Sequence, residues 1–532
     1  MPEYLSPGVY IQEVDSGPRP IEGVGTAMAA FVGFAAAGPI NRPVLVTNWT
    51  QYVENFGALE DGGRRNPHME GAFLSHSVYG YFLNGGGRCY VTRVALSPNG
   101  DGKKAQDEKK ALETATLQLP SKASKAVSSL TITPKETATE DIQIEIAPPT
   151  AEDPAPPEGT FTMRVRMGSV QESYENVNIG GRKGSKNVAE TVNQASQIVT
   201  ITEVQSAGPV ADRVPDTGTY LLKVAQPAPL AQVKNVKPGT FTGSAADRSG
   251  VEGLEVAEDV TMLCCPDIMA AHQAGALDAD GVKSVQLAMI AHCERMGDRM
   301  AILDPLPDLS PQDVKRWRQV DTNYDSKFAA VYYPWIKIPG PDGQPLAVPP
   351  SGFMAGIYAR NDNTRGVHKA PANEVVTGAL EAVAQVTKGE QDTLNPIGVN
   401  CIRSFTGRGL RVWGARTLSS DPAWRYINVR RLFNYVEKSI ENGTQWVVFE
   451  PNDPDLWARV RRDVSAFLTG VWREGALFGA TADQAFFVKC DEELNPPDVR
   501  DRGQLFIDIG MAPVKPAEFV IFRLSQWAGG GA

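Results

Sequence analysis

The stretch "VTMLCCPDIMAAHQAGALDADGVKSVQLAMIAHCERMGDRMAILD", residues 260–304, decides the fold class because it contains a strand, a helix and a second strand in succession. The run at 260–265 is apolar throughout, as in strands that are buried on both faces of a sheet. The helix that follows would carry these residues on one face: Val282, Val285, Met289, His292 and Met296. A second apolar run at 300–304 completes the unit, which predicts a largely parallel sheet covered by helices.

The alternation of helix and strand continues toward the C-terminus. A helix is expected around 310–320, a strand at 328–333, and another strand in "QWVVFE" at 445–450. Helix ends are indicated by Asn428 and Gly443 for one helix, and by Asp453 and Pro454 as N-cap and first residue of the next. The fold class predicted for the whole chain is therefore α/β and α+β, spread over several domains.

Residues 96–250 differ from the rest of the chain. Apolar residues alternate at period two in four stretches, "LTIT", "IQIEI", "FTMRVRM" and "QIVTITEV". Residues 96–160 contain 7 Lys and no Arg against 11 Asp plus Glu. This segment is predicted to be an acidic, all-β domain inserted into the larger fold, since insertions are tolerated where the flanking chain ends lie close together.

The composition excludes several classes of protein. A net charge of −10 over 532 residues argues against a dedicated nucleic-acid binder. The most apolar stretch, residues 26–38, has about half of the ~20 residues that a membrane-spanning helix needs, and the N-terminus lacks the pattern of a signal peptide. The six cysteines form no C-x-x-C pair, so buried reduced thiols are expected and neither a zinc site nor a disulfide framework.

Candidate catalytic residues are few. Asp267 and Asp304 each follow a predicted parallel strand, at the edge where ligands of such sheets bind, although carboxylates there also serve as turn residues. Ser351 in "PPSGFMAG" resembles a nucleophile at a helix start, and Asp267, His292 and Ser351 follow the order of a subtilisin-type triad. The helical spacing makes His292 a core residue instead, and no phosphate-binding loop is present. We therefore expect no catalysis, no metal and no cofactor, with a hydrolase as the alternative.

Arginines are concentrated in residues 401–440. The segment holds eight basic residues against two acidic ones: Arg403, Arg408, Arg411, Arg416, Arg425, Arg430, Arg431 and Lys438 against Asp421 and Glu437. Such a surplus in an acidic chain predicts contact with an acidic partner surface. The alternative is that these arginines pair with carboxylates or cover apolar surface within the fold.

Both ends of the chain have a strand-forming segment separated from the body by Pro and Gly. The N-terminal one is "GVYIQEV" at 8–14, and the C-terminal one begins at Glu518 in "EFVIFRLS". A tethered strand of this kind completes a sheet most readily in a neighbouring molecule. The two segments therefore predict a protein that assembles with copies of itself.

Several long motifs resemble those of contractile tail sheath proteins, found in phage tails and in extracellular phage-tail-like contractile injection systems. They occur in order along the chain: "SPGVYIQEV", "PPSGFMAGIYARND", "VWGARTLSSDPAWRYINVRRLFNYVEKSI", "WVVFEPND", "GALFG", "AFFVKCD" and "APVKPAEFVIFRLSQ". The resemblance does not extend to residues 96–250.

This resemblance implies a division of the chain into six segments. They are an N-terminal arm at 1–20, the first part of the core at 21–95, an outer domain at 96–250, a subtilisin-like domain without catalysis at 251–385, an inner domain at 386–511 and a C-terminal arm at 512–532. The inner domain would be built from both chain ends and would face an inner tube. The outer domain would decorate the outside, and an alternative role for it is that of a recognition module.

The resemblance also implies the residues that make contacts between molecules. The donated strands would be Val9, Tyr10, Ile11, Gln12, Glu13 and Val14 of one arm, and Glu518, Phe519, Val520, Ile521, Phe522 and Arg523 of the other. The candidates for contact with the tube are Arg403, Arg408, Arg411, Arg416, Arg425, Arg430 and Arg431. Partners would be further copies in hexameric rings, the tube, and baseplate and cap proteins, assembled in the bacterial cytoplasm without nucleic acid or insertion into a membrane.

Overall fold

The protein is described by a computed structural model that divides into two compact units. The terminal unit combines the described parts of Met1–Thr26 and Asp421–Ala532 with Asn361–Ala370, and the sheet unit comprises Ala27–Arg360 and Pro371–Ser420. The structure describes residues 21–59, 64–94, 116–122, 127–135, 141–150, 159–167, 170–180, 186–204, 213–223, 233 and 236–523. The predicted donor strand Val9–Val14 lies outside these residues.

An eight-stranded sheet forms the core of the sheet unit. Its order is β2 (Val44–Val46), β5 (Cys89–Arg93), β1 (Ala29–Gly33), β13 (Met262–Cys264), β14 (Met300–Leu303), β15 (Ala329–Tyr333), β19 (Val399–Phe405) and β20 (Gly409–Val412). The strands from β5 to β19 are parallel, and β2 and β20 are antiparallel to their neighbours. This confirms the parallel sheet expected from the apolar runs, because every residue of β1, β13, β14 and β15 is buried.

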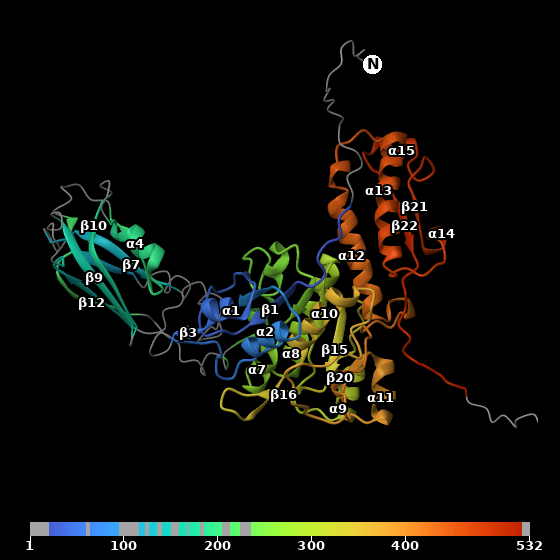
Figure 1. Ribbon diagram of the computed structural model, residues 1–532, viewed down its shortest axis with the longest axis horizontal. Coiled ribbons are helices and arrows are strands. Elements are labelled where there is room, and N and C mark those ends of the chain that lie inside the picture. Colours follow the sequence, from blue (N-terminus) through green and yellow to red (C-terminus); the bar gives the residue numbers. More distant parts are fainter. Residues whose placement is uncertain are drawn as a thin grey trace, which may run out of the picture. The chain divides into compact units, whose positions relative to one another are not determined.

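Helices pack on this sheet (Figure 1): α2 (Leu74–Leu83) and α7 (Asp267–Gln273) on β1, α8 (Ala279–Met296) on β14, and α11 (Lys388–Leu394) on β19. The sheet unit also contains α1 (Trp49–Phe56), α6 (Pro238–Thr242), α9 (Pro311–Arg316), and the small strands β3 (Ala58–Leu59), β4 (Arg65–Asn66), β16 (Ile336–Pro339), β17 (Pro345–Val348) and β18 (Glu381–Ala382). Helix α10 (Ser351–Arg365) belongs to the sheet unit up to Arg360, and its last residues belong to the terminal unit. The predicted helix at 282–296 is α8, which Asp278 caps and the left-handed Gly297 ends.

The inserted segment contains two sheets with a hydrophobic core of their own. One has the order β10 (Val170–Asn178), β9 (Thr160–Met167), β8 (Ile142–Ala147) and β12 (Gly218–Leu222), and the other β11 (Val199–Glu203), β7 (Ser128–Pro134) and β6 (Leu117–Pro120). The prediction of an all-β insertion was wrong, because α4 (Val188–Ala195) places Val188 and Val192 in this core, and α6 also lies within the predicted range 96–250. Asn187 caps that helix. An Asn at this position is a signal for a helix start, which the period-two pattern of the neighbouring strands does not include.

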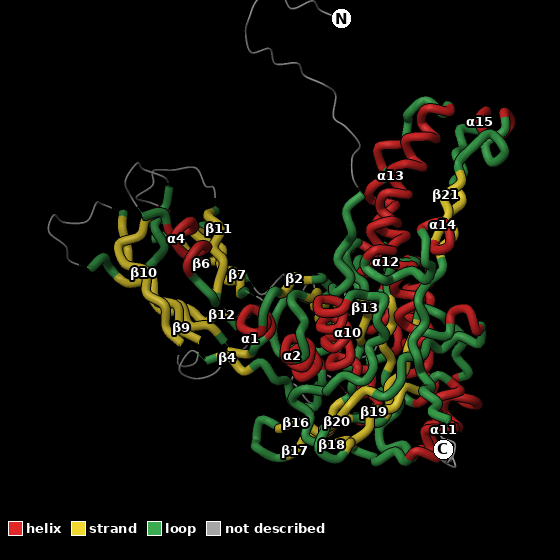
Figure 2. Tube along the Cα trace, turned by 45° about the vertical axis from the view of Figure 1, so that its right-hand side comes forward, coloured by secondary structure: helices red, strands yellow, loops and turns green. Residues whose placement is uncertain are grey.

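The terminal unit is built around two long helices, α12 (Ile427–Gly443) and α13 (Pro454–Arg473), which lie side by side (Figure 2). It also holds α14 (Ala482–Ala485), α15 (Pro497–Asp501) and a two-stranded sheet, β21 (Phe486–Lys489) with β22 (Asp508–Met511). Apolar residues of both helices, among them Val436 and Val464, share one core with residues of the sheet.

The helix ends of this unit confirm part of the prediction. Asp453 caps α13 with Pro454 as its first residue, and Gly443 is the last residue of α12. Asn428 is not the cap, since α12 already begins at Ile427. The expected strand at 445–450 was also wrong: Gln445–Val447 is a 3-10 turn, and its β-branched residues find no partner strand among the described residues.

The last two strands of the eight-stranded sheet follow residue 386, where the sequence predicts a domain boundary. Strand β19 pairs in parallel with β15, and β20 pairs with β19, so that both belong to the eight-stranded sheet. The last segment of the terminal unit begins at Asp421. Strand β19 of the central sheet therefore follows residues 371–398, which include β18 and α11. The sequence pattern did not predict that this strand belongs to the central sheet.

Candidate functional site

The carboxylate of Asp267 is fully buried and binds backbone groups. It accepts hydrogen bonds from the N–H groups of Phe34 (2.5 Å), Phe73 and Leu74 (3.2 Å), and thereby ties β1 to the start of α2. Burial raises the pKa of Asp267 to about 7, against the opposing effect of these three donors. The carboxylate is a tie between elements and is not available to a substrate.

Asp304 and Ser351 are joined to each other. The N–H of Ser351, at the start of α10, donates to Asp304 Oδ1 at 2.8 Å, so the carboxylate sits at a helix N-terminus. Both residues are buried, and burial raises the pKa of Asp304 to about 7.

His292 has different neighbours. Its Nε2 lies 3.1 Å from a guanidinium nitrogen of Arg299, and its Nδ1 lies 3.2 Å from one of Arg295. Burial first, and then these two positive charges, lower the pKa of His292 to about 3. Asp267, His292 and Ser351 therefore bind three separate sets of partners, and the order that resembled a triad is not matched by contacts.

Three of the arginines that were predicted to contact the tube are buried and have partners within the fold. Arg431 forms two hydrogen bonds with Asp362, Arg430 bonds to Asn434 and Glu437, and Arg416 donates to the carbonyl of Asn395. The alternative reading, pairing within the fold, holds for them. The spacing of Arg430, Asn434 and Glu437 along one helix face was a signal for it.

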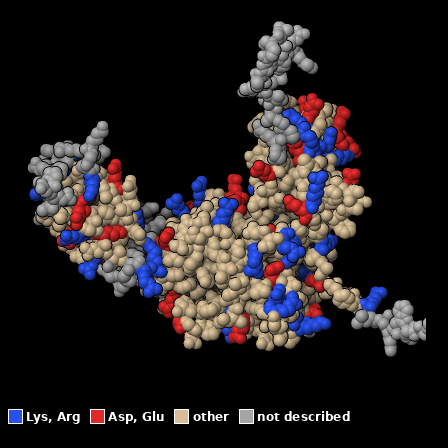
Figure 3. Space-filling view, in the orientation of Figure 1, with Lys and Arg blue, Asp and Glu red and all other residues tan. Residues whose placement is uncertain are grey.

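The other four arginines lie nearer the surface. Arg403 donates to the carbonyl of Val386 and to Gln391, and Arg408 and Arg411 donate to Asn373. Arg425 is half-buried at the start of the terminal unit. On the face drawn in Figure 3, Lys and Arg are interspersed with Asp and Glu.

The C-terminal donor segment is the most exposed apolar stretch among the described residues. Phe519, Val520, Ile521 and Phe522 are between 69% and 82% exposed and belong to no helix or strand. Residues just before Phe519 are bound at the start of α12. Tyr426 Oη donates to the carboxylate of Glu518 (3.0 Å), and Asn428 Nδ2 donates to the carbonyl of Val514 (3.2 Å). In Figure 1 the segment leaves the helices as an extended chain.

A sheet with open edges lies in the same unit. Strand β21 pairs with β22 over four residues and with no other described strand. Phe487 on β21 and Phe478 just before α14 are exposed. The motif "AFFVKCD" contains strand β21, and its aromatic and β-branched composition is typical of a strand.

The described residues show neither a cluster of His, Cys, Asp and Glu that could hold a metal ion nor a helix with the length and hydropathy to span a membrane. All six cysteines are buried and unpaired, as the sequence predicted.

Comparison with protein families decides the identity. The phage tail sheath protein central domain matches residues 251–418, and the phage tail sheath C-terminal domain matches residues 419–526, together more than half of the chain. The chain belongs to the phage tail sheath family. It is therefore a structural protein of a phage tail or phage-tail-like particle and not an enzyme, as its sequence predicted.

Relatives of known sequence are tail sheath proteins. That of Vibrio phage KVP40 is 30% identical over 177 residues, 32% of this chain and 26% of that protein. The sheath protein of Escherichia phage P2 is 25% identical over 353 residues, which cover 61% and 84% of the two chains. This chain spans only 47% of the prophage sheath protein of Pseudomonas aeruginosa.

Solved structures show the same mixed α/β, multidomain fold. The helical sheath of the anti-feeding prophage in its contracted state is similar with a TM-score of 0.56 and 24% identity over 98% of this sheath chain and 99% of that one. The contracted sheath complex of the extracellular contractile injection system PVC gives a TM-score of 0.54 and 23% identity over 99% of both chains.

Proposed function

We propose that this chain polymerises as stacked hexameric rings around an inner tube, and that the sheath contracts to drive the tube through a target cell envelope. The observation that carries the proposal is that one unit contains both an exposed strand-forming arm and a two-stranded sheet with open edges. An exposed apolar segment and an open sheet edge are both liabilities for a lone molecule, and each can cover the other between molecules.

The arms would extend the β21–β22 sheet of neighbouring copies. Residues 518–523 of one copy and residues 9–14 of another are the donor strands, and each makes a handful of backbone hydrogen bonds of about 0.5–1.5 kcal/mol net. One such contact is weak, but several on every subunit hold a lattice together. Because the C-terminal arm is anchored to α12 only at its base, where Asn428 binds the carbonyl of Val514, subunits can rotate while the strands remain paired.

The rest of the sheath chain fits this role. The sheet unit is the subtilisin-like domain, with its triad positions occupied by structural contacts, and the insertion is the outer domain. The terminal unit is the inner domain that faces the tube, and Arg425 is the candidate for tube contact because Arg430 and Arg431 of the same unit are buried. Contraction needs no nucleotide if the contracted lattice is the more stable one and tube, baseplate and cap contacts hold the extended one until triggered. The solved anti-feeding prophage baseplate includes a sheath-like chain, which supports a baseplate partner here, and the particle would be assembled in the bacterial cytoplasm.

Electron microscopy of the purified chain beside a chain ending at Met511 tests the proposal. The full chain should form long hollow tubes or rings, and the shortened chain should remain as monomers or short oligomers with the same circular dichroism spectrum. A second variant, Phe519→Ser with Ile521→Ser, keeps the length of the arm but removes two of its four exposed apolar side chains, and it should also remain as monomers or short oligomers. Tubes of equal length from all three chains would rule out the role of the arm.

A further inference from the structure

The eight-stranded sheet ends at β20, and a short irregular segment covers the outer edge of this strand. Three backbone hydrogen bonds join them. The N–H of Asn373 donates to the carbonyl of Val412 (2.7 Å), the N–H of Val412 donates to the backbone carbonyl of Glu374 (3.0 Å), and the N–H of Val376 donates to the carbonyl of Leu410 (3.0 Å). Val375 and Arg411 form an isolated antiparallel bridge at the same place. We refer to residues 373–377 as the edge guard.

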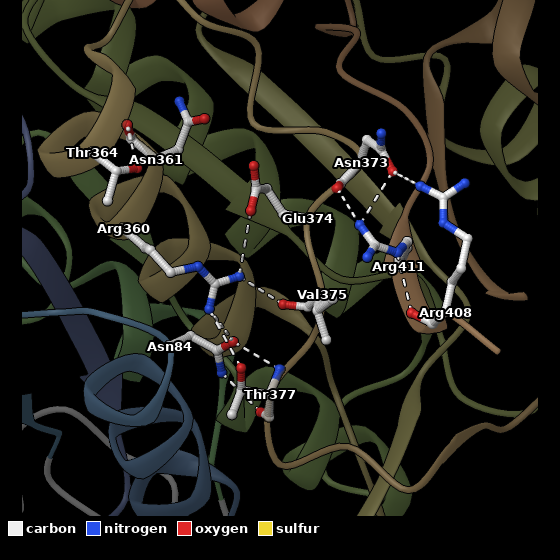
Figure 4. Close-up of polar contacts among 10 residues, drawn as sticks. All are labelled: Asn84, Arg360, Asn361, Thr364, Asn373, Glu374, Val375, Thr377, Arg408 and Arg411. Carbon is white, nitrogen blue, oxygen red and sulfur yellow. Dashed lines mark hydrogen bonds and ion pairs between the residues drawn. The ribbon is translucent and has the colours of Figure 1, made fainter.

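The edge guard is too short to hold itself in place by backbone pairing, and side chains from two helices fix it (Figure 4). Asn84, the fully buried residue that follows α2, donates to the carbonyl of Thr377 (3.0 Å) and accepts from its N–H (2.9 Å). Arg360 of α10 donates to the carbonyl of Val375 (2.6 Å) and lies 3.8 Å from the carboxylate of Glu374.

Side chains of the β19–β20 hairpin bind Asn373, the first residue of the edge guard. Arg411 donates to the carbonyl (2.7 Å) and to Oδ1 (3.2 Å) of Asn373, and Arg408 donates to the same Oδ1 (3.1 Å). Asn373 adopts a left-handed backbone conformation with φ of 60°, which Asn tolerates better than most residues. These bonds give Arg408 and Arg411 a function inside the molecule.

We propose that the edge guard keeps β20 from accepting the strand-forming arm of another copy, so that arms pair only with the β21–β22 sheet. The inference rests on the proposed strand exchange. A protein that presents segments such as Phe519–Phe522 in every copy would otherwise offer them a second acceptor, because the outward N–H of Val412 and the outward carbonyls of Leu410 and Val412 would lack partners. Asn84 and Arg360 are the positioning residues of this device, which sets the specificity of assembly.

The test uses the full chain, freshly purified and not yet assembled, with Asn84→Ala and Arg360→Met combined. Amide hydrogen exchange at Val412 and Val376 should become about tenfold faster or more, while amides of β13 and β14 keep their protection. Arg360→Lys, which retains a donor for the carbonyl of Val375, should restore part of the protection. Arg365→Met, an exposed arginine at the end of the same helix, is the matched control and should change nothing.

A second measurement asks what pairs with the uncovered strand. The double variant should self-associate in light scattering into species other than ordered tubes, and the same variant ending at Met511 should not. If the Val412 amide exchanges as slowly as in the wild type, or if the association persists without the arm, the proposal is overturned. If the circular dichroism spectrum shows that the double variant does not fold, the same measurements are made on the single variant Arg360→Met. Strand exchange itself is tested separately, by the tubes that the wild-type chain forms.

Discussion

Replacing Arg431 with methionine removes the cationic half of an ion pair buried in the terminal unit. The side chains of Arg431 and Asp362 are 3% and 2% exposed, and two hydrogen bonds of 2.8 and 2.6 Å join them. A third bond, of 2.9 Å, runs from Arg431 to the carbonyl of Thr26. The pair thus connects three separate stretches of the chain in one unit, and loss of either partner leaves a charge buried without its counterpart.

The expected cost follows from that burial. Breaking a buried pair by removing one partner destabilises by about 3–5 kcal/mol, whereas replacing both partners by apolar residues is often close to neutral. Arg431→Met and Asp362→Leu should each therefore destabilise the terminal unit by several kcal/mol. The double variant Arg431→Met with Asp362→Leu should cost less than either change alone.

Because a chain of several domains does not unfold in one step, the assay must be local. Hydrogen exchange of the amides of α12, followed in the unassembled chain as a function of denaturant, reports the opening free energy of this unit. Matching effects on amides of the inserted sheets, which belong to the sheet unit, would show that the substitution perturbed the chain beyond the terminal unit. If the double variant costs the sum of the two single ones, within about 0.5 kcal/mol, the two residues are not coupled and the reasoning is refuted.

Two further predictions concern pH. The pKa of Asp304 is raised to about 7, so its contribution favours the native state most below pH ~4 and is lost as the pH rises to about 7. Asp304→Asn should therefore make the opening free energy of the β14 amides, measured by hydrogen exchange, fall less steeply with pH than in the wild type across that window, and an unchanged slope would contradict this. His76, stacked on His68 with ring centroids 4.3 Å apart, has a pKa lowered to about 4 by burial first and then by His68, so the native state should lose stability as the pH falls from about 6.5 to about 4. His76→Phe keeps a ring at this place and should reduce the acid sensitivity measured by hydrogen exchange of α2, whereas equal sensitivity in both proteins would exclude His76 as its source.

The sequence predicted those features that local rules determine. The buried face of α8 followed from apolar spacing, and the start of α13 at Asp453 and Pro454 followed from the chemistry of helix caps. The positions of Asp267 and Asp304 at the ends of β13 and β14 were also correct.

What the sequence did not show depends on distant parts of the chain. Val447 and Val448 favour a strand by composition, but a strand needs a partner, and none is present for them among the described residues. Whether Arg431 points inward depends on Asp362, which lies 69 residues away. The assignment of β19 to the central sheet likewise depends on its pairing with β15, for which the sequence between 371 and 398 gives no signal.

Cross-linking of the arm to the β21–β22 sheet between different copies tests strand exchange most directly. The six native cysteines are buried, so cysteines introduced as Ile521→Cys in one batch and Phe487→Cys in another, both at exposed positions, can be joined selectively by a short bifunctional maleimide. Strand exchange predicts a covalent dimer when the two batches are assembled together, and much less of it from either batch alone. A chain carrying both changes that cross-links only within itself, with no dimer in the mixture, would contradict it.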